Sequence, residues 1–348
     1  MKLKKILYSI FAIAIVAAIA VAVALGATKT KSNAKYKVVA SNFASYDFLR
    51  AIIGDNKDVE LTFLLGPGKD AHSYDPTAQD LITIQNSNLF VYVGGEMEKW
   101  SDKVLDSLDM NNTEVICIAE FVDTIEEQEV DGAEEHEHEH DHDHEDEDEH
   151  HEEGEEHEHH EEGEEHEHHH EEGAFDEHIW TSPANAIKMV NALEEAMEKI
   201  DSENKDKYKE NANKYIAQIK DVDNKIQNIV DNKVRSRLIF ADKMPMQYFI
   251  NYYKLDVSAA FNGCSSETEP SAKTIAYLED KVKEEKIPVV LYIELNPGRV
   301  AQTIADETGT KAMQIQTLHN VSLDDFNKGE TWVSLMTRNI EVLKAALQ

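Results

Sequence analysis

The histidines of this chain fall into two groups that suit different chemistry. Fourteen of the 17 histidines lie between Asp131 and Glu172, among 24 acidic residues and without one Lys or Arg. Imidazole and carboxylate groups bind divalent transition metals, so this tract is expected to collect such ions with little selectivity. Its like charges and few apolar side chains predict a solvated, disordered loop over residues 126–172. An acidic linker that only aids solubility is the alternative, but it would not need histidines.

The other three histidines, His72, His178 and His319, are far apart in the sequence. Each falls in a predicted loop: His72 after a strand, His178 between the tract and a helix, and His319 after the last strand. Open α/β sheets bind ligands in the loops beyond the carboxyl ends of their strands. One loop histidine alone would be an ordinary polar surface residue, but three of them predict a metal site assembled by folding.

Two series of alternating strands and helices are predicted to position these loops. The first has strands at 36–40, 59–65, 89–93 and 114–118, and helices at 43–53, 76–86 and 99–108. The second has strands at 238–241, 257–260, 289–294 and 312–315, and helices at 246–253, 272–285, 299–307 and 332–347. Such alternation is typical of parallel sheets covered on both faces. The expected fold class is therefore α/β, with two four-stranded lobes and a metal in the cleft between them.

A long helix at 205–231, preceded by another at 183–200, is predicted to join the lobes. Its apolar residues recur at alternating steps of four and three, which gives a narrow stripe. A coiled-coil dimer would show a similar stripe, but a brace within a monomer is the preferred interpretation. The expected limits are 28–125 with 173–200 for the N-terminal lobe, 201–235 for the linking helix, and 236–348 for the C-terminal lobe.

Charge and cysteine content exclude several classes of protein. The net charge is −35, of which the tract contributes −24, so the remainder carries −11. Phosphate binding needs a basic face, and a moderately acidic chain without one is not expected to bind nucleic acid. The two cysteines, Cys117 and Cys264, fall in different predicted lobes and are expected to be buried or free.

The first residues have the pattern of an export signal. Lys2, Lys4 and Lys5 precede an uncharged apolar run at 6–26. At ~1.5 Å per residue this run is long enough to cross a ~30 Å hydrocarbon core, so residues 1–27 are expected to be either a cleaved signal peptide or a membrane anchor. Thr28 stands where a lipidated cysteine would be needed. The expected location is extracytoplasmic, at the outer face of the cytoplasmic membrane.

Several motifs together resemble one known family. These are Gly-Lys-Asp-Ala-His-Ser-Tyr-Asp-Pro-Thr at 68–77, Asp-Glu-His-Ile-Trp at 176–180, Glu-Thr-Glu-Pro-Ser at 267–271 and Ile-Ala-Asp-Glu-Thr-Gly at 304–309, with the histidine-rich loop and the linking helix. The chain resembles the metal-binding (cluster A-I) solute-binding proteins of ABC transporters, zinc type. The resemblance implies one metal in the cleft, delivery to a membrane permease and no catalysis. It places the first two ligands at His72 and His178.

The remaining ligands do not follow directly from the resemblance. The family's third ligand, His or Glu, falls on Lys243, and an ammonium group cannot ligate. The family's carboxylate near the last strand falls on Gln316, a weak ligand, so His319 three residues later is the expected substitute. Glu294, at the end of its strand, is the preferred fourth ligand, and the alternatives are Glu267, Glu269 and Asp242.

The ligand types predict the metal and the function. Three imidazoles with one carboxylate or water favour tetrahedral Zn²⁺ over Mn²⁺, although nickel and cobalt also accept imidazole. The expected function is that of a high-affinity zinc receptor which delivers Zn²⁺ to an ABC permease. Its affinity should fall below pH ~6.5, where imidazole becomes protonated. A metal buffer or adhesin is one alternative; a zinc hydrolase is another, although no predicted helix carries a His-Glu-x-x-His motif.

Overall fold

The computed structural model describes residues 34–133, 175–263, 265 and 269–348. The predicted export segment at 1–27, the tract from 134 to 172, Cys264 and Glu267 lie outside the described residues. Among the helices that are described, none is both long and apolar enough to cross a bilayer. Cys117 is half-buried and free, and its thiol donates a hydrogen bond to the carbonyl of Val93 at 3.3 Å.

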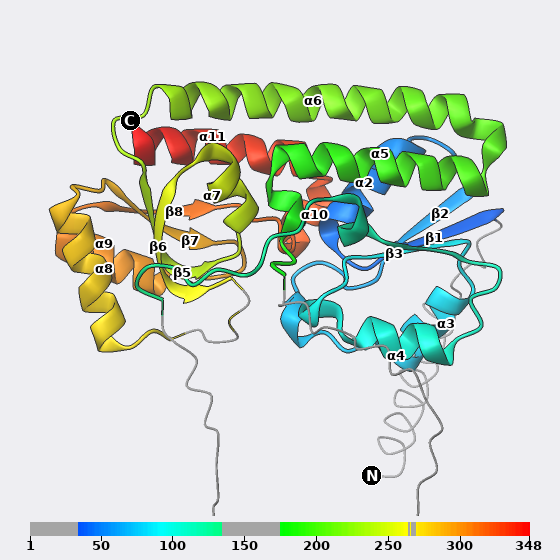
Figure 1. Ribbon diagram of the computed structural model, residues 1–348, viewed down its shortest axis with the longest axis horizontal. Coiled ribbons are helices and arrows are strands. Elements are labelled where there is room, and N and C mark those ends of the chain that lie inside the picture. The colour runs from blue at the N-terminus through cyan, green and yellow to red at the C-terminus, as the bar shows by residue number, and fades with distance from the viewer. Residues whose placement is uncertain (1–33, 134–174, 264, 266–268) are drawn as a thin grey trace, which may run out of the picture.

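The described chain contains two four-stranded sheets in which all strands run parallel (Figure 1). The first comprises β1 (Tyr36–Ala40), β2 (Val59–Phe63), β3 (Leu89–Tyr92) and β4 (Glu114–Cys117), in the order β2-β1-β3-β4. The second comprises β5 (Arg237–Met244), β6 (Asp256–Asn262), β7 (Val289–Ile293) and β8 (Lys311–Ile315), in the order β6-β5-β7-β8. The predicted fold class, two α/β lobes, is confirmed.

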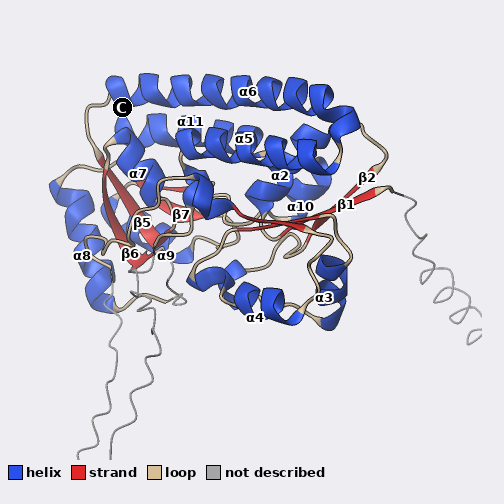
Figure 2. Ribbon diagram, turned by 45° about the vertical axis from the view of Figure 1, so that its right-hand side comes forward, coloured by secondary structure: helices blue, strands red, loops and turns tan. Residues whose placement is uncertain are grey.

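Helices cover both faces of each sheet, which explains why the inner strands are apolar on both sides (Figure 2). The N-terminal lobe has α2 (Phe43–Ile53), α3 (Ala78–Gln85), α4 (Trp100–Ser107) and α5 (Pro183–Ile200). The C-terminal lobe has α7 (Gln247–Tyr253), α8 (Ala272–Glu284), α9 (Arg299–Thr308) and α11 (Trp332–Leu347), whereas α10 (Leu323–Lys328) packs its Phe326 against Tyr46 and Phe63 of the N-terminal lobe. The main apolar core continues from one lobe into the other.

The helix α6 (Lys205–Asp231) is the brace between the lobes. It runs along one side of both of them, above α5 and α11 in Figure 1, and it packs against α2, α5 and α11. Its 27 residues span about 40 Å at ~1.5 Å per residue. The apolar stripe, with Tyr208, Ile219 and Ile226 fully buried, is covered within the chain. The seam that a coiled-coil dimer would use is therefore already occupied.

One buried carboxylate ties the brace to both lobes. Asp47 in α2 accepts hydrogen bonds from the Tyr215 hydroxyl of α6, from the backbone N–H of Trp332 in α11 at 2.7 Å, and from Arg50 at 2.5 Å. Burial raises the pKa of Asp47, but these donors oppose that effect. Three donor groups on three helices thus depend on one side chain.

We expect Asp47→Ala to lower the free energy of unfolding by about 3 kcal/mol, because it leaves buried donors and the Arg50 charge without their partner. Urea unfolding of the variant and of the parent measures this difference. Asp221→Ala is the matched control, since Asp221 lies on the exposed face of α6 and, among the residues that the structure describes, pairs only with Lys225. Its effect should stay below about 0.5 kcal/mol. An equal loss in both variants would contradict the role of Asp47.

The predicted disordered loop begins too early at residue 126. Glu126 forms a bridge to Phe175, Val130 is buried, and the Asp131 carboxylate binds Arg237 at 3.1 Å. The C-terminal lobe therefore holds residues up to Ala133. The acidic composition does not reveal these contacts, because their partners lie far away in the sequence: Phe175 is 49 residues from Glu126, and Arg237 is 106 residues from Asp131.

Two helices also differ from the prediction. The helix expected from residue 76 begins at Ala78, because Thr77 and Asp80 form a reciprocal capping box. The short helix α10 was not predicted; Ser322 caps it by accepting a hydrogen bond from the backbone N–H of Asp325. In both helices the first residue is set by a capping hydrogen bond to a nearby side chain. For α3 this cap, and not Pro76, determines where the helix begins.

Candidate metal centre

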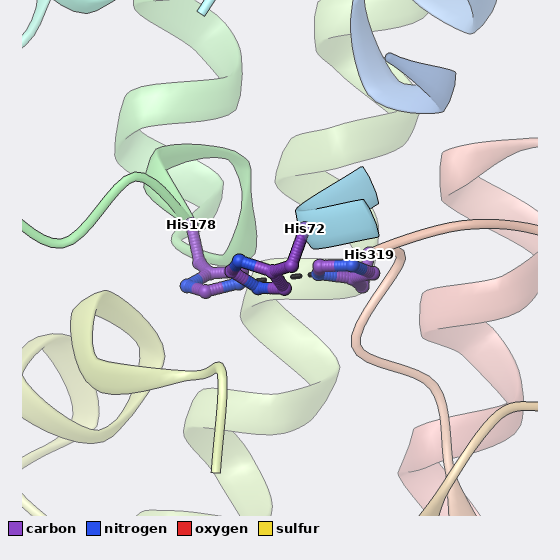
Figure 3. A group of neighbouring side chains, drawn as sticks. All are labelled: His72, His178 and His319. Atoms are coloured by element: carbon purple, nitrogen blue, oxygen red, sulfur yellow. Dashed lines mark hydrogen bonds between the residues drawn. The ribbon is translucent and has the colours of Figure 1, made fainter. Parts of the chain in front are cut away.

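The three isolated histidines meet in the cleft between the lobes (Figure 3). One ring nitrogen from each of His72, His178 and His319 lies within 4.8 Å of the others. The Nε2 atom of His178 is 3.2 Å from Nδ1 of His319, and the rings of His72 and His319 stack with centroids 4.9 Å apart. Among the described residues, no carboxylate or thiol joins this group. The group predicted from three separate loops is thus brought together by the fold.

The loop after β2 positions His72. Gly66 and Gly68 both have positive φ angles, 74° and 76°, which turn the chain into the short helix η1 (Ala71–Ser73). Asp70 caps η1 by accepting a hydrogen bond from the backbone N–H of His72 at 3.0 Å. The Nε2 atom of His72 is buried and has no hydrogen-bond partner within the described part of the chain. Such an atom is rare in native proteins, and its lone pair is free to bind a metal ion.

Asp176 orients His178, which is fully buried. The Oδ1 atom of Asp176 accepts a hydrogen bond from the backbone N–H of His178 at 2.8 Å and lies 3.1 Å from its Nδ1. When Nδ1 donates to Asp176, the lone pair of Nε2 points toward His319. Burial lowers the pKa of His178, but the Asp176 carboxylate, with the charges of Glu177 and Glu127, more than compensates and holds this pKa above its ordinary value.

Glu294 positions the loop that carries His319. Its carboxylate accepts hydrogen bonds from the backbone N–H and the hydroxyl of Thr317, at 2.7 and 2.8 Å, and from the backbone N–H of His319 at 2.9 Å. Between them, Leu318 has a φ of 59°, a conformation that costs a non-glycine residue free energy. The indole N–H of Trp180 donates to the Thr317 carbonyl at 3.0 Å, which joins this loop to the one that follows His178.

The structure gives the predicted fourth ligands other roles. Glu294 lies behind His319 and directs its oxygens to backbone donors, so it supports the site rather than joining the group. Asp242 likewise accepts from the backbone N–H groups of Lys243 and Ile293, at 2.8 and 3.1 Å. Glu269 is exposed, and the side chain of Gln316 donates to Gln314 at 3.1 Å. Burial raises the pKa of both Glu294 and Asp242.

Two supporting carboxylates were missed by the sequence reasoning. Asp70 lies 3.4 Å from Nε2 of His319, and Asp176 lies 3.1 Å from Nδ1 of His178. Each is the first residue of an Asp-x-His pattern, at 70–72 and at 176–178. A carboxylate behind a ligating imidazole fixes its tautomer and orientation. The repeated pattern was the signal from which these residues could have been found.

Burial and the repulsion between neighbouring positive charges lower the pKa values of two of the three histidines. Burial lowers the pKa of His72 to about 3, and the nearby charges of His319, His178 and Lys243 act in the same direction. Burial also lowers the pKa of His319. Neutral imidazoles offer lone pairs to a metal, and three nitrogen ligands suit tetrahedral zinc with one position left open. Lys243 stands at the edge, with its Nζ atom 3.5 Å from Oδ2 of Asp70.

Comparison with known proteins identifies relatives over nearly the whole described chain. The family model described as zinc-uptake complex component A, periplasmic (ZnuA), matches residues 38–346. The chain is 30% identical over 313 residues to the high-affinity zinc uptake system protein ZnuA of Bacillus subtilis, covering 90% of this chain and 88% of that protein. It is 28% identical over 318 residues to the zinc-binding lipoprotein AdcA of Streptococcus pneumoniae, but spans only 56% of it.

Solved structures share the two-lobed fold. The metal-dependent lipoprotein YcdH of Bacillus subtilis superposes with a TM-score of 0.69 at 24% identity, covering 90% of this chain and 99% of that one. The Zn(II)-bound ZnuA-like domain of Streptococcus pneumoniae AdcA has a TM-score of 0.68 at 24% identity, covering 90% and 98%. At this level of identity the likeness concerns the fold and not the ligands.

Proposed function

Because the chain belongs to the family of periplasmic zinc-uptake complex component A proteins, we propose that it is an extracytoplasmic receptor for Zn²⁺. It binds one ion in the cleft and delivers it to an ABC permease for uptake. The observation that carries this proposal is the convergence of His72, His178 and His319, whose ring nitrogens lie within 4.8 Å of one another. The buried, unpartnered Nε2 atom of His72 supports it.

The donor set favours zinc over manganese. Three imidazole nitrogens and one open position match the tetrahedral coordination of Zn²⁺, whereas Mn²⁺ prefers more oxygen ligands. His72, His178 and His319 are the proposed ligands, with Asp176 and Asp70 behind two of them. Capture and release of an ion make or break no covalent bond in a substrate. The chain is therefore proposed to act as a receptor and not as an enzyme.

The cleft contacts suggest how the ion is held and released. The backbone N–H of Gly68 donates to Val321 at 2.8 Å, and the side chain of Asn320 donates to the carbonyls of Gly66 and Lys69 at 3.0 and 2.5 Å. These bonds join the His72 loop of one lobe to the His319 loop of the other. Separation of the lobes on a permease would break them and divide the ligand set. We propose that the receptor acts as a monomer, exported by residues 1–27 and cleaved or anchored there.

The histidine-rich tract has a place in the same proposal. It follows Ala133 on the C-terminal lobe and ends near Phe175, three residues before His178. One end is therefore held by the C-terminal lobe, where Asp131 pairs with Arg237 at 3.1 Å, and the other end lies close in the sequence to His178. We propose that the tract collects zinc and raises its concentration at the site. In the alternative function, a metal buffer, the tract would be the main binder.

Calorimetric titration distinguishes these two functions. We expect one tight zinc site, and no equally tight manganese site, in the full chain and in a variant that lacks residues 134–172. The full chain should show additional, weaker zinc sites, because flexible imidazoles and carboxylates bind with less preorganisation. A deletion variant that remains folded but has no tight zinc site would make the tract the binder and replace the receptor with the buffer.

A further inference from the structure

A cavity of about 380 Å³ adjoins the three histidines. His319 and Asp70 line it on the side of the metal group, and Lys243, Ile293 and Leu295 line it from the C-terminal lobe. A zinc ion needs little of this space, since its ligands stand ~2.0 to 2.2 Å away. Pockets of ~300 to 1,000 Å³ are typical of sites for organic molecules. The cavity is therefore larger than the metal requires.

The metal also lacks a fourth ligand from the described protein. The carboxylates of Glu294 and Asp242, although they line the cavity, are bound to backbone N–H groups. Asp70 accepts from the backbone of His72, and Glu269 is exposed. Zinc completes a set of three protein ligands with water or with a group of its bound substrate. The open position is therefore available to a donor that enters through the cavity.

Lys243 supplies a positive charge for such a donor. The residue is only 9% exposed, and among the described residues its ammonium group has one side-chain partner, Asp70, at the long distance of 3.5 Å. An ammonium group has three donors, and a largely buried charge without a close partner is costly. It is also repelled by a divalent ion bound nearby. An anion between the metal and Lys243 would relieve both costs.

One part of the cavity wall is apolar. Ile293 and Leu295 contribute to it together with Pro245, Pro297 and Val300. Leu295 is 45% exposed and has a φ of 66°, which is unfavourable for a residue other than glycine. An apolar side chain is therefore exposed at this wall. A bare inorganic anion would use the cation but not this wall. The cavity therefore fits a molecule that has one anionic end and a short apolar part.

We propose that the cavity binds a small organic carboxylate with a short apolar portion as the fourth ligand of the metal, and that Lys243 is its ion-pair partner. The receptor would then take up zinc together with an organic anion. This inference rests on the proposed function, because the metal forms one half of the anion site. It assigns Lys243, which cannot ligate the metal itself, a role in choosing the anion.

Cobalt spectroscopy of the full chain tests this inference, with butyrate as the probe. Tetrahedral Co²⁺ absorbs visible light much more strongly than six-coordinate Co²⁺, and subtraction of the His319→Ala spectrum removes the contribution of the tract. We expect butyrate to change the cobalt spectrum saturably in the parent and in Lys243→Arg. The apparent butyrate affinity should fall at least tenfold in Lys243→Met. The matched control Lys188→Met, in an exposed pair with Asp123, should behave like the parent.

The outcomes separate this inference from the proposed function. If cobalt binds tightly but butyrate leaves its spectrum unchanged, water completes the site, and the inference is overturned while the receptor stands. An equal response to butyrate in Lys243→Met, or to the neutral amide butyramide in the parent, also overturns it. If no tight cobalt site exists before butyrate is added, the proposed function itself fails.

Discussion

Replacement of His319 by alanine is expected to weaken the zinc affinity of the cleft more than about 100-fold. The basis is geometric: Nδ1 of His319 lies 3.2 Å from Nε2 of His178, and its ring stacks on His72. Loss of a group that only supports a ligand costs about 10- to 100-fold in metal affinity, and loss of a ligand should cost more. Competition with a zinc-selective fluorescent chelator, in the chain without residues 134–172, measures this change.

Leu323→Ala is a suitable control for His319→Ala. Leu323 begins α10 four residues later and is 60% exposed, so its loss should leave zinc affinity and stability unchanged. Circular dichroism and thermal unfolding establish whether both variants are folded. Unchanged zinc affinity in a folded His319→Ala variant would remove His319 from the ligand set. The two motif histidines would then need another partner from the same cleft.

The sequence alone predicted the strands and the longer helices, though not the short helix α10, and it also predicted the three histidines that the fold assembles. Strand and helix periodicity is local, and three loop histidines outside the tract could be counted. The direction of a side chain at a strand end is not local. Glu294 was expected to face the metal, but it turns toward the backbone of Thr317 and His319. That choice depends on a loop more than twenty residues later in the chain.

The same reason explains the other differences. Residues 126–133 read as part of an acidic loop, yet Asp131 pairs with Arg237 and Lys281 of the C-terminal lobe. Lys243 cannot ligate, and its place beside an adjoining cavity emerged only from the packing of the two lobes. Patterns of spacing predict which residues lie on loops. They do not predict which donors of another segment those residues meet.

Glu294→Ala is expected to weaken zinc binding by about 10- to 100-fold, although Glu294 does not touch the metal. The variant loses three hydrogen bonds to Thr317 and His319, and the backbone N–H of His319 keeps only its long contact of 3.4 Å to the Thr317 hydroxyl. The strained Leu318 between them would relax, and the ring of His319 would lose its position. The free energy of unfolding should fall by about 2 to 4 kcal/mol for the same reason. Glu269→Ala, at the exposed rim of the cavity, is the control and should change neither quantity.

Glu294→Gln distinguishes a supporting carboxylate from a direct ligand. Glutamine keeps an acceptor oxygen for the backbone N–H groups, so it should preserve part of the zinc affinity that alanine loses. Because the metal ligands remain the same three histidines, the visible spectrum of the cobalt-loaded variant should match that of the parent. A direct carboxylate ligand would behave differently, since its replacement by an amide changes the ligand field itself. A changed cobalt spectrum in Glu294→Gln would therefore restore Glu294 to the coordination sphere, and only an unchanged spectrum with weakened affinity fits a residue that acts through His319.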